Sequence, residues 1–423
     1  MHLGPGAFHR AHQAVFTEDA SLAGGGEWGI VGVSLRHGDA KAALVPQDGL
    51  YAVEFLGVKP RTRVIGVIGE VLVAPETPEA VLAALAAPAT RIVTLTVTEA
   101  GYCLDGHGAL DIHHPDIVDD LAGRTRSAIG WIVRALGERR RTGAGPLTVI
   151  SCDNLLNNGA RLEAAVLALA DRLAPGLAAW IGANAAFPST MVDCIVPGSD
   201  ARHRARVAAA LGMTDEASVQ REVFAQWAIE DRFAGLRPAW ERAGVEIVAS
   251  VAAHERLKLH VLNAAHSALA YLGLPRGIDY MRQAIADPDL GGFADAMIAQ
   301  EVAPALFDLD VEPYWQSVRT RLANPMLDHR LSQIGEDGSV KLAQRIFPLI
   351  VAGARSGRPT PRLATVVRAW LDCARQRLAR DVRAERLAAA GGELSAALDD
   401  PVLFPNPFRK DAAVRAAILG SPT

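Results

Sequence analysis

HLGPGAFHRAHQAVFTEDASLAGGGEWGIVGVSL, residues 2–35, predicts a short strand, a glycine turn, a helix and a buried strand. WGIVGVSL is a nearly continuous apolar run, which is typical of a parallel strand that is covered on both faces. Gly4 and Gly6 form a GxG turn between the first strand and the helix. Because only three residues precede this turn, the first strand is clipped: either the start of the chain is truncated or the strand is very short.

Strands and helices continue to alternate up to about residue 250. The predicted strands are YAVEFLGV, TRVIGVIGEVLVA, RIVTLTVTEAGY, GPLTVISCDN and TMVDCIVPG. This alternation is typical of the α/β class, in which helices cover both faces of a largely parallel sheet. Beyond residue 250 the apolar residues recur at helical spacing only. We therefore predict an α/β domain over residues 1–250 and an all-helical domain over residues 251–423.

The bulk properties exclude several classes of protein. A chain of 423 residues is too long for one typical core, and its net charge of −4 does not indicate binding to nucleic acid or to an anionic membrane. The four cysteines lie far apart and form no CxxC pair, which suits a reducing cytoplasm. We see no secretory signal and no run of about 18 uncharged apolar residues, so we expect no membrane span.

Two histidine pairs raise the question of a metal site. His9 and His12 form an HxxH pattern, and His113 and His114 are adjacent. Neither pair has a third ligand at a recognisable spacing, and neither belongs to an HExxH motif. We therefore predict no bound metal.

The glycine turn is the first candidate binding site. Glycine lets the backbone approach a phosphate, and the following helix offers free N–H groups. His9 stands where GxGxxG would have its third glycine, so a plain strand–helix turn explains the pattern as well. After the second strand, Asp39 is a candidate partner for ribose hydroxyls, which favours NAD, whereas Arg36 favours the 2′-phosphate of NADP.

Further polar residues follow later strands. Thr98 and Glu99 follow one strand, and Asn154 follows another. In open α/β sheets ligands bind beyond the carboxyl ends of the strands, but such residues also close turns, as Asn157-Asn158-Gly159 suggests. Asp193 lies inside an apolar strand, where an acid needs a partner, so it belongs either to a site or to a structural pair.

KLHVLNAAHSALAYLG, residues 258–273, predicts an apolar helix that is interrupted by three polar residues. At about 100° per residue, Lys258, His266 and Asn263 lie at about 0°, 80° and 140° around the axis and share one broad face. Glu255 stands one turn before Lys258. A surface Glu–Lys pair with a buried histidine explains these residues as well as an active site does.

A lysine on such a face becomes a useful base if its pKa falls. The usual pKa of about 10.4 makes lysine a poor base at neutral pH. Desolvation, or the positive charge of an oxidised nicotinamide ring, lowers that pKa. Lys258 would then take the proton of an alcohol as hydride leaves, and asparagine side chains would donate hydrogen bonds to the forming alkoxide. This scheme needs no metal.

The motifs together resemble the polyol-specific long-chain dehydrogenase/reductase family, which includes mannitol 2-dehydrogenases and fructuronate reductases. In chain order the motifs are GPGAFHRAHQ, GVSLR, PQDGLY, VTEAGY, SCDNLLNNG, FPSTMVD, QWAIEDRF, KLHVLNAAHSALAYLG and DGSVKLAQR. Their number and order make the resemblance specific. It implies a Rossmann-type N-terminal domain, a helical C-terminal domain and metal-independent hydride transfer between NAD, rather than NADP, and a secondary alcohol of an open-chain polyol or sugar acid.

The resemblance also implies roles for individual residues. Lys258 would be the general base, Asn154 and Asn263 would stabilise the alkoxide, His266 would contact the substrate and Glu255 would relay the proton. The residues that bind the cofactor would be Gly4, Gly6, Phe8, Asp39, Thr98 and Glu99. Those that bind the substrate would be Asp193, Gln333, Lys341 and Arg345.

Some positions depart from the family pattern. Ala100 follows VTE where the family often has lysine, and Cys194 follows Asp193 where it often has arginine. Gln333 stands where mannitol dehydrogenases commonly have arginine, so HRLSQIGEDGSVKLAQR is more similar to fructuronate reductases. Those enzymes reduce a keto acid, so we expect a cation such as Lys341 or Arg345 to bind its carboxylate, although a surface position on a helix explains Arg345 as well.

The sequence therefore predicts an NAD-dependent fructuronate reductase that interconverts D-fructuronate and D-mannonate. The alternatives are a mannitol 2-dehydrogenase or an arabinitol-type dehydrogenase, or, from another class, a non-catalytic relative that binds a sugar or a nucleotide. We expect a cytoplasmic monomer or small homo-oligomer whose partner is a small-molecule sugar acid or polyol, with no nucleic acid and no membrane.

Overall fold

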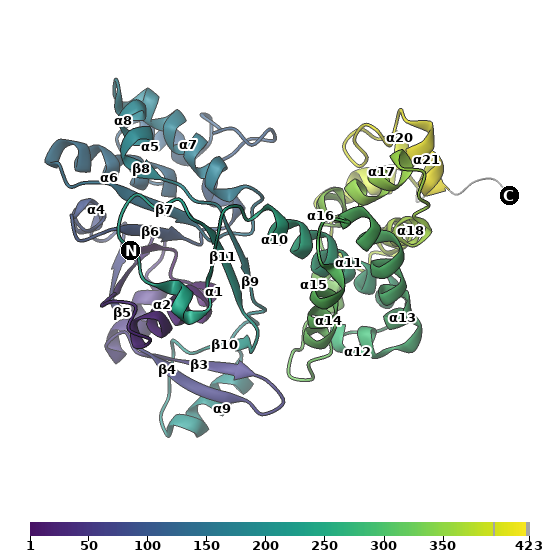
Figure 1. Cartoon of the computed structure of the whole chain (residues 1–423), viewed down its shortest axis with the longest axis horizontal. Coiled ribbons are helices and arrows are strands. Elements are labelled where there is room, and N and C mark those ends of the chain that lie inside the picture. The colour runs from purple at the N-terminus through teal and green to yellow at the C-terminus, as the bar shows by residue number, and fades with distance from the viewer. Residues whose placement is uncertain (392–393, 420–423) are drawn as a thin grey trace. The chain divides into compact units, whose positions relative to one another are not determined.

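The computed structural model describes residues 1–391 and 394–419 (Figure 1). The chain divides into two compact units, Met1–Ala252 and Ala253–Thr423. The first unit combines a six-stranded parallel sheet with helices and two small sheets, and the second unit is helical. The predicted class, an α/β part with a largely parallel sheet followed by an all-helical part, is confirmed.

The strands of the central sheet are all parallel and lie in the order β5-β2-β1-β6-β7-β8. They are β1 (His2–Leu3), β2 (Ile30–Ser34), β5 (Ile68–Val73), β6 (Ile92–Leu95), β7 (Leu147–Ser151) and β8 (Ala185–Ala186). In β1, Leu3 pairs with Val33 on one side and with Leu95 on the other. The strand order reverses between β1 and β6, which is where a doubly wound sheet binds its ligand.

Helices cover both faces of this sheet. The helices of the first unit are α1 (Ala7–Ala11), α2 (Gln13–Leu22), α3 (Asp39–Leu44), α4 (Pro78–Ala86), α5 (Pro115–Leu121), α6 (Ala128–Thr142), α7 (Asn158–Leu173), α8 (Leu177–Asn184) and α9 (Ala201–Leu211). Leu3, Val33 and Val149 pack with α4, α6 and α7, whereas Ile30 and Ile68 pack with α1 and α2. Burial on both faces explains the continuous apolar runs in the sequence.

Two small sheets depart from the simple alternation that the sequence predicts. One contains β10 (Val219–Glu222), β3 (Tyr51–Leu56) and β4 (Arg61–Ile65), and the other contains β12 (Glu246–Val248), β11 (Gln226–Glu230) and β9 (Thr190–Asp193). Of the predicted strands, YAVEFLGV and the start of TRVIGVIGEVLVA lie in the first small sheet, and TMVDCIVPG begins with a strand of the second. Since β3 and β4 pair antiparallel through a short connection, they form a local hairpin instead of a crossover.

A buried pair of stacked histidines packs next to the glycine turn. The rings of His2 and His9 are stacked with their centroids 3.4 Å apart. His2 bonds to the hydroxyls of Thr94 at 2.7 Å and Thr96 at 2.9 Å, whereas neither ring nitrogen of His9 has a hydrogen-bond partner among the described residues. Burial lowers the pKa of His2 to about 3 and the pKa of His9 well below its usual value. Both rings are therefore neutral at physiological pH.

Replacing His9 by phenylalanine is expected to make the folded protein less sensitive to acid. Below about pH 6.5 the unfolded chain takes up a proton at His9, whereas the folded chain does not. The free energy of unfolding therefore keeps its full value above this pH and falls by roughly 1.4 kcal/mol per pH unit below it. The urea unfolding midpoint at pH 7.5 and at pH 5 measures the change. His107→Phe, at an exposed position, is the control; an unchanged pH dependence in His9→Phe would contradict the expectation.

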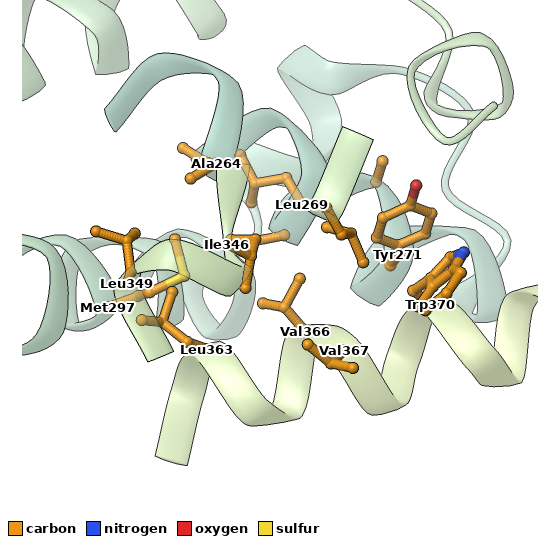
Figure 2. Packing of buried hydrophobic residues seen from close by; sticks show 14 of the residues in the cluster. Ala264, Leu269, Tyr271, Met297, Ile346, Leu349, Leu363, Val366, Val367 and Trp370 are labelled. Atoms are coloured by element: carbon orange, nitrogen blue, oxygen red, sulfur yellow. The ribbon is translucent and has the colours of Figure 1, made fainter. Parts of the chain in front are cut away.

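The second unit is a bundle of helices around one core. Its helices are α10 (Ala252–Leu257), α11 (Asn263–Gly273), α12 (Met281–Ala286), α13 (Pro288–Met297), α14 (Val311–Leu322), α15 (Leu331–Ile334), α16 (Gly338–Arg345), α17 (Phe347–Arg355), α18 (Pro361–Arg375), α19 (Ala384–Ala389), α20 (Leu394–Asp399) and α21 (Ala412–Leu419). Figure 2 shows side chains of α11, α13, α17 and α18 meeting in this core. Because most of α11 is buried, it is a rigid support for its polar residues.

In the described ranges, no helix has the length and apolar character needed to cross a membrane.

Candidate active site

A cleft of about 580 Å³ opens at the glycine turn of the first unit. Gly4 has φ +87°, and a Cβ atom there would lie 2.3 Å from the carbonyl oxygen of Thr96, so the turn requires glycine at this position. A Cβ at Gly6 would meet nothing closer than 3.8 Å, so the backbone there is open to a ligand. This arrangement, at the switch point of the sheet, fits the diphosphate of a dinucleotide.

Arg10 is a cleft residue that the sequence reasoning missed. Its Nη1 donates to the carbonyl of Pro5 at 2.7 Å, inside the glycine turn. Its Nε is buried and has no hydrogen-bond partner in the described part of the chain. Burial lowers the pKa of this guanidinium, so its charge is poorly compensated and suits a phosphate. Its position one turn after Gly6 is the signal that points to it.

The candidate cofactor residues fall into two groups. Asp39, at the start of α3, lines the cleft together with Gly4 and Gly6. Three others do not line it: Phe8 is half-buried and stacks on His12 with the ring centroids 5.1 Å apart, whereas Thr98 and Glu99 are exposed beyond β6.

Asp153, two residues after β7, anchors the loop that follows β6. The carboxylate of Asp153 accepts hydrogen bonds from the backbone of Val97 at 3.0 Å and Thr98 at 2.9 Å, and from the hydroxyl of Tyr102 at 2.8 Å. Burial raises the pKa of Asp153, and these hydrogen bonds oppose the rise. Asp153 therefore fixes the backbone that carries the next residue, the candidate Asn154.

Asn158 is a buried bridge that the sequence reasoning took for part of a turn. Its side-chain nitrogen donates to the carbonyl of Thr190 at 2.9 Å, and its oxygen accepts from the Thr190 N–H at 2.9 Å. Asn157 provides the left-handed residue before α7. The amide of Asn158 thus fastens β9, whose last residue is the buried candidate Asp193.

In the second unit, the candidate base lies on a π-helical turn. The chain runs from α10 through a π-helical turn, Lys258–Leu262, into α11, and the N–H of Asn263 bonds to the carbonyl of Lys258. The expectation of a regular α-helix with about 140° between these two residues is therefore wrong. A π-turn closes by an i→i+5 bond, so Lys258 and Asn263 lie nearly one above the other. Such turns are frequent at functional sites.

His266 of α11 is buried and neutral. Burial, helped by the nearby His329 and Arg345, lowers the pKa of His266 well below its usual value. Its Nε2 has no hydrogen-bond partner within the described ranges, and its ring meets that of His329 edge-on at 5.5 Å. His329, which the sequence reasoning did not single out, also has a lowered pKa because of burial and the charge of Lys341.

Two cations of α16 lie near this group. Arg345 Nη1 donates to Ser267 Oγ at 3.1 Å and is 3.4 Å from the carbonyl of Asn263. Lys341 Nζ bonds to a backbone carbonyl at 3.3 Å, and burial lowers its pKa, with Arg345 contributing. Neither cation forms an ion pair with an acid in the part of the chain that is described. Gln333 is exposed on α15, and Glu255 is half-buried on α10.

One cluster of metal-ligand type lies in the first unit. Ligand atoms of Cys103, His114 and Asp116 lie within 4.8 Å of one another. Asp116 is already paired with Arg36. Burial raises the pKa of the Cys103 thiol to about 12, which disfavours the thiolate that binds metals. We assign no metal to this cluster.

The fold and the cleft define a protein built from a Rossmann-type unit and a helical unit. Residues 1–242 match the mannitol dehydrogenase Rossmann domain, and residues 250–385 match the mannitol dehydrogenase C-terminal domain. The chain therefore belongs to the mannitol dehydrogenase family, and the resemblance stated from its motifs is confirmed.

Relatives of the chain are named oxidoreductases and dehydrogenases. The chain is 41% identical to D-mannonate oxidoreductase of Escherichia coli over 383 residues, which cover 88% of this chain and 79% of the relative. It is 39% identical to mannitol 2-dehydrogenase of Phaeosphaeria nodorum over 383 residues, which cover 88% of this chain and 67% of that relative. Mannitol 2-dehydrogenase of Pseudomonas fluorescens, solved as a ternary complex with NAD and D-mannitol, matches with a TM-score of 0.86 at 35% identity, covering 99% of this chain and 89% of that chain.

Proposed function

We propose that this chain is an NAD-dependent, cytoplasmic oxidoreductase that interconverts D-fructuronate and D-mannonate. The observation that carries the choice of a sugar acid is the pair of partly buried cations, Lys341 and Arg345, which form no ion pair with an acid in the described residues. Nearby acids act on Lys341 without a direct ion pair, so a substrate carboxylate would supply the close counter-ion that a partly buried charge needs. The relative named D-mannonate oxidoreductase supports the same choice.

The cofactor site of the proposal is the cleft at the glycine turn. Gly4 and Gly6 would let the backbone approach the diphosphate, Arg10 would face its charge, and Asp39 would bond to ribose hydroxyls. NAD supplies the hydride acceptor for oxidation of the alcohol, and its reduced form supplies the hydride for the reverse reaction.

In the proposed chemistry one proton moves between the substrate oxygen and Lys258, in oxidation and in reduction alike. Lys258, uncharged, takes the proton of the alcohol in oxidation and returns it to the oxygen in reduction. Asn154 and Asn263 donate hydrogen bonds to the oxygen as its negative charge develops. Glu255 relays the proton between Lys258 and solvent. Because hydrogen bonds and the ammonium group stabilise the oxyanion, the scheme requires no metal.

The remaining candidates hold the substrate. His266 is neutral, so its ring can exchange hydrogen bonds with substrate hydroxyls without adding charge. Asp193 accepts hydrogen bonds from other hydroxyls, and Lys341 or Arg345 binds the carboxylate. Gln333 contacts the substrate in this proposal as a neutral side chain.

Assays of a substrate panel test the proposal. The purified protein is given D-mannonate, D-mannitol or D-arabinitol, each with NAD and with NADP. We expect kcat/KM to be highest for D-mannonate with NAD, by about tenfold or more over the neutral polyols. A higher value for D-mannitol would replace the proposed substrate with the mannitol alternative. Coenzyme binding without turnover of any of these would indicate a non-catalytic relative.

A further inference from the structure

Arg36 is the cation at the carboxyl end of β2. In doubly wound folds an arginine near this point accommodates the 2′-phosphate of NADP. Arg36 lines the cleft together with His37 and Asp39, and its side chain is 48% exposed. The position of Arg36 alone would therefore favour NADP, whereas the acid Asp39 favours NAD.

The structure shows that this guanidinium already has a partner. Arg36 Nη2 forms an ion pair with Oδ2 of Asp116, 80 residues further along the chain. Asp116 lies in the first turn of α5, and its backbone N–H bonds to His114 Nδ1 at 3.2 Å, which fixes the start of that helix. An arginine bound to a carboxylate offers less charge and fewer N–H groups to a phosphate.

None of the other charged side chains that line the cleft supplies a free cation at the carboxyl end of β2. Arg10 lies beneath the glycine turn, where it bonds to Pro5. Arg126 is paired with Asp119 at 3.6 Å. Asp39 and Glu216 are acids. Release of Arg36 from its carboxylate would therefore add one unpaired cation at the end of β2.

We propose that Asp116 is a specificity-determining residue, which makes the cleft prefer NAD over NADP by holding Arg36. This inference rests on the proposed function, since it requires that the cleft binds a nicotinamide dinucleotide. Asp116 acts through Arg36 and is not assigned any contact with the cofactor.

Fluorescence titration of the protein with NADH and with NADPH tests this inference without the sugar reaction. Asp116→Asn keeps the shape of the side chain and removes its charge. We expect it to tighten NADPH binding about three- to tenfold, in line with the modest strength of an exposed ion pair, and to leave NADH binding within about twofold. Adding Arg36→Ala to Asp116→Asn is expected to abolish the gain, whereas Arg36→Ala alone changes NADPH binding little.

Asp171→Asn is the matched control, because it removes one exposed negative charge from α7, outside the cleft. Unchanged NADPH binding in Asp116→Asn, or an equal gain for NADH, would overturn the inference. An equal gain in the Asp171→Asn control would also overturn it, because net charge would then be the cause. If the unaltered protein binds neither NADH nor NADPH, the proposed function fails, and this inference fails with it.

Discussion

Replacing Lys258 by alanine is expected to lower kcat about a thousandfold or more for the preferred substrate. The proposal gives this residue the proton transfer to and from the reacting oxygen, and a positioned general base contributes about 10²–10⁴ in rate. Lys258 begins the π-helical turn, and alanine is a good helix former, so the helix is expected to persist. Initial rates with saturating coenzyme measure kcat, and NADH fluorescence measures coenzyme binding, which should stay within about twofold of the unaltered protein.

A chemical rescue separates a lost base from a damaged fold. A small primary amine, such as ethylamine, added to Lys258→Ala should restore part of the rate, with a pH dependence that follows the pKa of the added amine. Lys59→Ala, an exposed change in the connection between β3 and β4, is the control and should leave kcat unchanged. Retention of more than about a tenth of the rate in Lys258→Ala would rule out the proposed base.

Replacing Arg345 by methionine is expected to lower kcat/KM for D-mannonate about a hundredfold, or ~2.7 kcal/mol, while kcat/KM for a neutral polyol changes less than about threefold. The reason is that only the sugar acid brings a carboxylate to the partly buried cation. Lys341→Met tests the second cation in the same way. The ratio of kcat/KM for D-mannonate to that for D-mannitol is the decisive measurement.

The ratio is needed because Arg345 also supports the fold. Its guanidinium bonds to Ser267, so part of any loss will affect all substrates equally. Arg358→Met, at an exposed position that forms no ion pair among the described residues, is the matched control and should leave the ratio unchanged. If the two substrates lose equally in Arg345→Met and in Lys341→Met, these cations do not bind a carboxylate.

The sheet could be predicted from the sequence because burial leaves a local pattern. Apolar runs such as WGIVGVSL reflect strands covered on both faces, and a GxG turn after a strand predicts an exposed backbone at its carboxyl end. The partners of the strands leave no such pattern. β9 and β11 pair across more than thirty residues, and β10 pairs with β3, so the two small sheets follow from tertiary contacts that no local pattern contains.

The candidate site was predictable in composition but not in geometry. Lys258, Asn263 and His266 are conspicuous because they are polar in an apolar helix. The π-helical turn cannot be recognised in the sequence, because helix propensity does not distinguish an i→i+5 bond from an i→i+4 bond. Packing decides which of the two bonds forms. The pairing of Arg36 with Asp116 is equally hidden, since it joins residues 80 positions apart.

Arg345 is attached to both the middle and the end of the π-helical turn. Its carbonyl lies 3.1 Å from Nδ1 of His260, inside the turn, and its guanidinium lies 3.4 Å from the carbonyl of Asn263, which follows the turn. If the substrate carboxylate binds this arginine, the same contact also steadies the segment that presents the base. Recognition of the acid would then improve catalysis after binding as well as affinity, so a substrate lacking the carboxylate would react slowly even at saturation.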